Sequence, residues 1–204
     1  MNLKDEGAHW PVVSSAEPFR GRLVTVRTDE VRMPDNVVAE RDVVIHPGAV
    51  AVLALDDAGQ VLLIRQYRHP VSRLLWEIPA GLRDVSGEPP WATARRELLE
   101  EAGYRALDWR VLADYYTSPG FSTERLRVFL ARDLEFVPEA ERDFVPADEE
   151  TQLVSAWLPL DEAVRKVFAG ELHNGVAALG VMAGYAARSE GFDRLRPADA
   201  PEEQ

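Results

Sequence analysis

The stretch from Gly81 to Tyr104, GLRDVSGEPPWATARRELLEEAGY, constrains the fold of this chain more than any other. Pro89 and Pro90 suit the start of a helix, and Gly103 suits a left-handed stop after it. At about 100° per residue, one side of this helix carries an apolar stripe and the other side collects Thr93 and glutamates. The stripe consists of Trp91, Ala94, Leu98 and Ala102. The segment therefore predicts a helix with one face in a core and an acidic face opposite.

The acidic face contains Glu97, Glu100 and Glu101. Glu97 and Glu101 are four residues apart, so their carboxylates emerge side by side and repel each other. Like charges at this spacing destabilise an isolated helix by only about 0.2–0.5 kcal/mol. Repulsion alone therefore does not separate a functional carboxylate cluster from an ordinary solvated face, and both interpretations stay open at this point.

The wider segment follows the pattern E-x7-R-E-U-x-E-E-x-G-U, in which U is apolar. Its fixed positions are Glu88, Arg96, Glu97, Leu98, Glu100, Glu101, Gly103 and Tyr104. This pattern resembles the box of the Nudix hydrolases. The chain departs from that box once, because six residues, Leu82 to Gly87, separate the first glycine from the first glutamate where the family usually has five. The extra residue lies in the turn before the helix, so we expect it to shift the loop and leave Glu97 and Glu101 in place.

Length and composition set broader bounds on the protein. A chain of 204 residues with a net charge of −12 and no cysteine fits one domain with a substantial core. Its charge would repel a nucleic-acid backbone or an anionic membrane, and the lack of cysteine excludes a disulfide framework or a cysteine-based zinc site. No apolar run reaches membrane-spanning length, and the start, MNLKDEGAHW, lacks the regions of a signal peptide. Cytoplasm is the expected location.

The order of elements predicts an α/β fold. Residues 1–45 are expected to form an N-terminal arm of about 16 residues and a small β block, residues 46–190 the main domain, and residues 191–204 a flexible tail. Within the main domain, the apolar runs Ala49–Leu55 and Val61–Ile64 flank a tight turn and favour a hairpin. Later segments alternate between strands and helices, which favours a mixed sheet with helices on both faces. The family resemblance implies the same architecture, an α/β/α sandwich.

The carboxylates limit the choice of metal. Glutamates gathered without histidine or cysteine favour oxygen-preferring cations, Mg²⁺ or Mn²⁺, over Zn²⁺. Because Mg²⁺ commonly shares its shell with substrate phosphates, the cluster predicts a phosphate-containing ligand. The resemblance implies metal ligands from Glu97, Glu101 and the main-chain carbonyl of Ala80. Glu100 is a candidate additional ligand.

Further motifs bear on the substrate. The segments HPGAVAV, RQYRHP, LWEIPAG and SPGFS resemble the ADP-ribose pyrophosphatase branch of the family, and Pro119 lies about sixteen residues past Gly103, where that branch has a proline. In that branch Arg68 matches an arginine that contacts substrate, and Arg41 matches one near the adenine, although an exposed strand residue is an equal alternative for Arg41. A guanidinium can bind phosphate through two hydrogen bonds or stack on a base. The remaining candidates for substrate contact are Gly81, Pro119 and Gly120.

The catalytic glutamate of this branch lies outside the box, on a loop before a late strand. The candidates are Glu149 and Glu150, within ADEETQLVSAW, and the sequence does not choose between them. A carboxylate close to the attacking water can act as its base. Acidic loop residues that only improve solubility are the alternative interpretation.

With the carboxylate cluster, the resemblance implies Mg²⁺-dependent hydrolysis of ADP-ribose to AMP and ribose 5-phosphate. The resemblance also implies a homodimer in which the N-terminal block crosses to the partner copy. One alternative is hydrolysis of another nucleoside diphosphate derivative, such as a different nucleotide sugar, a dinucleotide or an oxidised nucleotide. A second alternative is a binding module that holds ADP-ribose without cleaving it, although the chain keeps Glu97, Glu100 and Glu101, which degenerate members of the family commonly lose.

Overall fold

The computed structural model describes residues 3–142 and 153–202. The chain divides into two compact units. The first contains residues 1–48, 116–125 and 201–204, and the second contains residues 49–115 and 126–200. The elements are β1 (Val12–Arg20), β2 (Thr25–Arg32), β3 (Val38–Ile45), β4 (Ala49–Ala54), β5 (Gln60–Arg68), η1 (His69–Val71), β6 (Arg73–Glu77), β7 (Ala80–Leu82), α1 (Pro90–Ala102), β8 (Tyr104–Tyr116), β9 (Arg125–Phe136), η2 (Glu139–Glu141), β10 (Val154–Pro159), α2 (Leu160–Phe168), α3 (Gly175–Arg188) and β11 (Arg196–Pro197).

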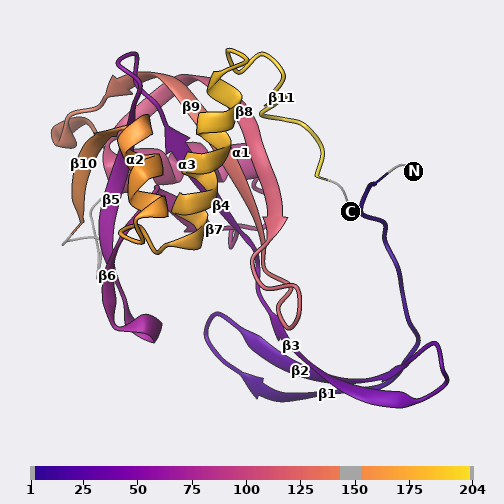
Figure 1. Ribbon diagram of the computed structural model, residues 1–204. Coiled ribbons are helices and arrows are strands. Elements are labelled where there is room, and N and C mark those ends of the chain that lie inside the picture. The colour runs from indigo at the N-terminus through magenta and orange to yellow at the C-terminus, as the bar shows by residue number, and fades with distance from the viewer. Residues whose placement is uncertain (1–2, 143–152, 203–204) are drawn as a thin grey trace. The chain divides into compact units, whose positions relative to one another are not determined.

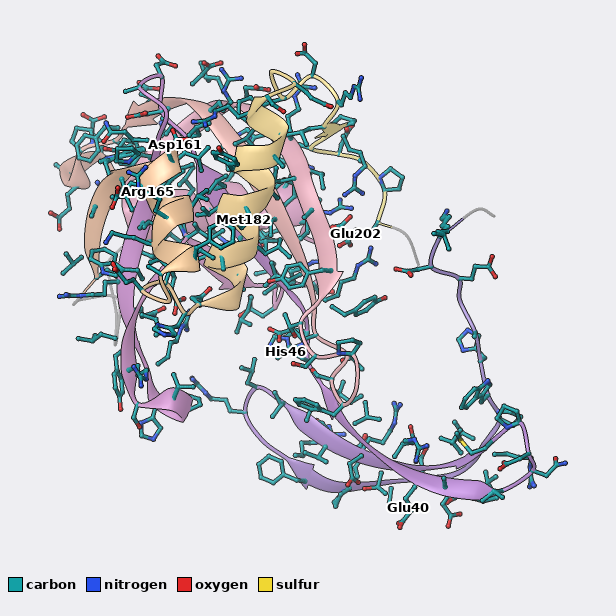
Figure 2. All side chains as sticks on the ribbon, in the orientation of Figure 1. Glu40, His46, Asp161, Arg165, Met182 and Glu202 are labelled. Atoms are coloured by element: carbon teal, nitrogen blue, oxygen red, sulfur yellow. The ribbon has the colours of Figure 1, made fainter. Side chains whose placement is uncertain are left out.

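The first unit is built on an antiparallel sheet in the order β1-β2-β3. Its strands bury little, since every residue of β1 is exposed and Asp29 is the buried residue of β2. The expected N-terminal sheet is therefore present, but it starts at Val12, so the unstructured arm is shorter than predicted. The loop after β8 belongs to this unit, because the amide of His46 (Figure 2) donates to the Thr123 hydroxyl at 3.0 Å.

The second unit contains two sheets, in the orders β11-β8-β9-β4-β7 and β10-β5-β6. Strands β4 and β9 run parallel, whereas β7 is antiparallel to β4, so the larger sheet is mixed. Alternate residues of β4 enter two separate core clusters, with Ala51 and Leu53 in one and Val50 and Val52 in the other. Burial on both faces explains the unbroken apolar run of β4 in the sequence.

Helices cover both faces of this core. Leu98 of α1 packs into the cluster that contains Val50, while Ala163 of α2 and Val181 of α3 pack into the cluster that contains Leu53. Figure 1 shows α2 and α3 side by side on their face of the sheet. Because the helices lie on opposite faces of a mixed sheet, the predicted α/β/α sandwich is confirmed. No helix in the described part of the chain has the length and apolar character needed to cross a bilayer.

Local rules set the ends of the helices. Pro89 caps α1 in an extended conformation, Pro90 is its first residue, and Gly103 follows it with φ of 73°, as the sequence predicted. The side chain of Asn174 caps α3 by accepting a hydrogen bond from the amide of Ala177 at 2.9 Å.

Two predictions about the second unit differ from the structure. Strands β4 and β5 do not form a hairpin, because beyond a single bridge between Leu55 and Val61 each enters a different sheet. Both strands are buried centrally in their sheets, and each takes its neighbours from more distant segments. The tail also differs from the expected flexible segment: β11 pairs with β8, and the carbonyl of Ala200 accepts a hydrogen bond from Arg127 at 2.7 Å.

Candidate functional site

The acidic face of α1 packs against β7, which buries Glu97 and leaves Glu100 and Glu101 partly buried. Glu97 is only 9% exposed, and a Cβ built on Gly81 would lie 2.0 Å from its carboxylate carbon. Such an approach is available only to glycine, so Gly81 is required by the position of Glu97. Since ordinary solvated carboxylates are not enclosed in this way, the interpretation of a purely solvated acidic face is wrong for Glu97.

Glu101 lies beside the main chain at the start of β7. The amide of Ala80 donates a hydrogen bond to its Oε2 at 2.8 Å. Burial raises the pKa of Glu101 to about 8, and the charges of Glu97 and Glu77 add to the rise while the Ala80 amide and Arg68 oppose it. The structure thus brings together Ala80, Gly81, Glu97 and Glu101, four of the residues selected from the sequence. The carboxylate of Glu101 is held where its negative charge is poorly stabilised by the protein itself.

Arg96 holds the neighbouring acids in place. Its Nη1 donates to Glu97 at 2.7 Å and to Glu100 at 3.0 Å, and its Nη2 lies 3.4 Å from Glu88. Burial alone would lower the pKa of Arg96, but the charges of Glu97 and Glu100 and the hydrogen bonds to Glu88 and Glu100 outweigh burial and raise it above its ordinary value. Arg96 therefore stabilises the acid cluster by ion pairing.

The unusual loop before α1 joins the same cluster. Gly87 takes up a left-handed conformation with φ of 80°, and the amide of Glu88 closes a turn onto Val85. Glu88 then accepts a hydrogen bond from the Thr93 hydroxyl at 2.8 Å, which together with Arg96 holds the pKa of Glu88 below its ordinary value. The loop accommodates its extra residue without displacing the first glutamate of the box from Arg96.

Sequence reasoning missed Glu77, which lies at the end of β6 and is 2% exposed. The guanidinium of Arg68 binds this carboxylate through two hydrogen bonds, Nε to Oε1 at 2.9 Å and Nη2 to Oε2 at 2.6 Å. The signal was a single acid within the apolar segment LLWEIPA. A buried charged residue requires a partner, and Arg68 supplies it.

The donor set suits a hard divalent cation. Glu97 and Glu101 supply two adjacent carboxylates, and the raised pKa of Glu101 marks a position that a positive charge would stabilise. Within residues 3–142 and 153–202, no three acidic or histidine side chains form a complete ligand set on their own. A partial side-chain set is compatible with Mg²⁺, which keeps waters and takes further oxygens from main-chain carbonyls and substrate phosphates. The residues present therefore fit the predicted ion.

The other candidates fall elsewhere in the chain. Arg41 is an exposed residue of β3, where its Nη1 donates to the carbonyl of Glu40 at 2.7 Å. Pro119 and Gly120 are exposed loop residues, and like Arg41 they belong to the first unit, whereas the acid cluster belongs to the second. Glu149 and Glu150 lie outside the described residues. The assignment of these five residues stays a prediction.

Known proteins resemble this chain in sequence and in fold. The sequence pattern of the NUDIX domain matches residues 45–178. The chain is 47% identical over 189 residues to the ADP-ribose pyrophosphatase of Mycobacterium tuberculosis, covering 92% of this chain and 88% of that protein. It is 36% identical over 169 residues to the ADP-ribose pyrophosphatase of Bacillus subtilis, covering 83% and 89%. A solved structure, described as an ADP compounds hydrolase, matches with a TM-score of 0.77 at 20% identity, covering 92% of this chain and 99% of the other.

Proposed function

Because the chain belongs to the Nudix family, we propose that it hydrolyses the diphosphate bond of ADP-ribose to AMP and ribose 5-phosphate, with Mg²⁺ as its cofactor and Mn²⁺ as a substitute. The observation that carries this proposal is the enclosure of Glu97 and Glu101 side by side against Ala80 and Gly81. The similarity to ADP-ribose pyrophosphatases over most of the chain supports the choice of substrate.

Each residue has a defined part in this proposal. The carboxylates of Glu97 and Glu101, the carbonyl of Ala80 and, as an additional ligand, Glu100 would hold the metal. The bound metal would neutralise the diphosphate and lower the pKa of the attacking water. Arg68 would bind a phosphate oxygen of the substrate, since the resemblance matches it to an arginine that contacts substrate and a guanidinium suits phosphate. Water adds to phosphorus, the P–O–P bond breaks, and both products leave as phosphate monoesters.

The proposal includes a homodimer and a cytoplasmic location. The sheet β1-β2-β3 buries almost no apolar side chain of its own, and Val12, Phe19 and Val37 are each more than half exposed. A second copy that covers this sheet would remove these side chains from water, which favours association. Arg41 of the same unit would then lie near the adenine, and Pro119 and Gly120 stay candidates for substrate contact. Sedimentation velocity measures the association state directly.

A panel of nucleoside diphosphates tests the function. ADP-ribose, other nucleotide sugars, dinucleotides and oxidised nucleotides are each incubated with Mg²⁺ and, separately, with Mn²⁺, and the products are separated by chromatography. We expect AMP and ribose 5-phosphate from ADP-ribose, with the highest kcat/KM in the panel, and no turnover in the presence of EDTA. Tight binding of ADP-ribose without release of AMP would instead identify a binding module, and a better substrate elsewhere in the panel would reassign the specificity.

Glu149 and Glu150 are tested as glutamine variants. Because a general base contributes about 10²–10⁴-fold to a rate, replacing it should lower kcat by at least about 100-fold. Metal affinity, measured by titrating activity with Mg²⁺, should change little because the ligands on α1 remain. The other of the two variants should keep near wild-type kcat and serves as the matched control. If both variants keep wild-type kcat, the base does not come from this pair.

A further inference from the structure

Glu77 is a buried carboxylate that the chemistry above does not use. Its side chain is 3% exposed, against 41% for the side chain of Arg68, its partner. The inner partner is thus enclosed by the fold, while the outer partner reaches the surface. Burial of a carboxylate costs free energy unless the carboxylate is hydrogen-bonded. Breaking the pair between Glu77 and Arg68 is therefore unfavourable.

The register of the strands shows how far the two side chains reach. Arg68 lies opposite Arg73 across β5 and β6, whereas Glu77 lies opposite Ile64. Four residues of strand, about 13 Å, therefore separate the two positions along the sheet. Because residues 64 and 68 share a face of β5, the side chain of Arg68 must run back along this face to meet Glu77. The contact thus fixes the direction of a long side chain that starts at the very end of a strand.

The pair also acts electrostatically on the acid cluster. Arg68 and Glu77 both act on the pKa of Glu101, with opposite signs, so the charges of the pair lie within electrostatic range of that carboxylate. Glu77 takes the Nε and one Nη of the guanidinium, which also fixes the rotation of its plane. A planar guanidinium held in this manner keeps one orientation.

We propose that Glu77 is the positioning residue that orients the Arg68 guanidinium to bind the diphosphate of the substrate. This inference rests on the proposed function, and it assigns to Glu77 a role in substrate binding in addition to its role in the fold. Arg68 touches the substrate, and Glu77 acts through Arg68.

The test replaces Glu77 with glutamine, which keeps the shape but turns one acceptor into a donor that faces the guanidinium. We expect KM for the diphosphate substrate to rise about tenfold while kcat stays within twofold, since an interaction made equally in the bound substrate and the transition state affects KM alone. Binding of ADP-ribose to the metal-free protein in EDTA, measured by calorimetry, should weaken by a similar factor. Glu77→Asp keeps a carboxylate and should restore part of the loss.

A double-mutant cycle separates positioning from a merely structural role. If Glu77 acts through Arg68, Glu77→Gln should change KM by less than twofold in an Arg68→Lys background, because a lysine cannot form the paired hydrogen bonds. A matched control is Asp114→Asn, which breaks a carboxylate–guanidinium pair of similar geometry, in which Arg127 binds Asp114 at 2.7 and 2.9 Å. This control should lower Tm and leave KM unchanged.

The possible results have separate meanings. An unchanged KM and an unchanged metal-free affinity in Glu77→Gln would overturn the inference, as would a KM effect of equal size in both backgrounds. Where a variant of the double-mutant cycle folds poorly, the metal-free affinities of Glu77→Asp and Glu77→Gln for ADP-ribose are compared instead. Tighter binding by Glu77→Asp supports the inference, and equal binding by the two variants contradicts it. Failure of the proposed function shows instead in the wild type, which would then release no AMP from ADP-ribose, and the cycle is run with the nucleoside diphosphate that the wild type cleaves.

Discussion

Glu101→Gln is expected to lower kcat for ADP-ribose hydrolysis by about 1000-fold or more. Glutamine keeps one oxygen and the size of the side chain but removes the charge that would bind the metal beside Glu97. Loss of several kcal/mol of charge stabilisation in the transition state corresponds to about three orders of magnitude in rate. Steady-state kinetics over a range of Mg²⁺ concentrations measures the loss. Wild-type kcat in this variant would reject the proposed metal site.

The metal-free protein provides a control for this variant. The folded-state pKa of Glu101, about 8, lies above its ordinary value of 4.5, so between these pH values the folded protein binds more protons than the unfolded chain. Rising pH therefore lowers the free energy of unfolding across this window, and the stabilisation is complete only below the ordinary pKa. We expect Tm in EDTA to fall from pH 5 to pH 8 in the wild type and to fall less in Glu101→Gln. An equal fall in both proteins would mean that Glu101 does not titrate in this range.

Gly81→Ala is expected to lower kcat/KM by about 100-fold with the fold retained. The added Cβ would lie 2.0 Å from the carboxylate carbon of Glu97, so either Glu97 or strand β7 must move. A displacement of about 1 Å in a catalytic arrangement can cost about 100-fold in rate. Kinetics with ADP-ribose and Mg²⁺ measure the loss, and circular dichroism shows whether the secondary structure persists.

The matched control for this variant is Gly175→Ala. Gly175 is the first residue of α3, and a Cβ added there would meet nothing within 4 Å. The same chemical change should leave kcat/KM unchanged and raise Tm slightly, since alanine restricts the unfolded chain more than glycine does. Full activity in Gly81→Ala would show that the close approach of Gly81 to Glu97 is not needed for catalysis.

The sequence determined the features that depend on neighbours along the chain. The limits of α1 follow from Pro90 at its start and Gly103 after its end, so local backbone rules predicted this helix almost to the residue, and the cap of α3 by Asn174 obeys rules of the same kind. The pairing of Arg96 with Glu100 also follows from helical spacing. For the same reason, the convergence of Glu97 and Glu101 could be stated before any fold was known.

Only the tertiary structure decided contacts between distant segments. An apolar run shows that β4 is buried but does not reveal which strands pair with it. For this reason the sequence predicted a β4–β5 hairpin, whereas β4 and β5 belong to different sheets. The packing of Ala198 and Ala200 on the core likewise lacks a periodic signal in so short a segment. The Arg68–Glu77 pair depends on the register of β5 against β6, and the sequence alone did not reveal it.

The acid cluster shows both kinds of information at one site. Helical periodicity puts the glutamates on one face, but an exposed face and a buried metal site have the same periodicity. What distinguishes them is the glycine of β7 against Glu97 and the amide of Ala80 against Glu101, contacts across 16 and 21 residues of chain. The electrostatic environment of a carboxylate depends on what surrounds it in space, so the folded chain, and not the order of its residues, sets the raised pKa of Glu101.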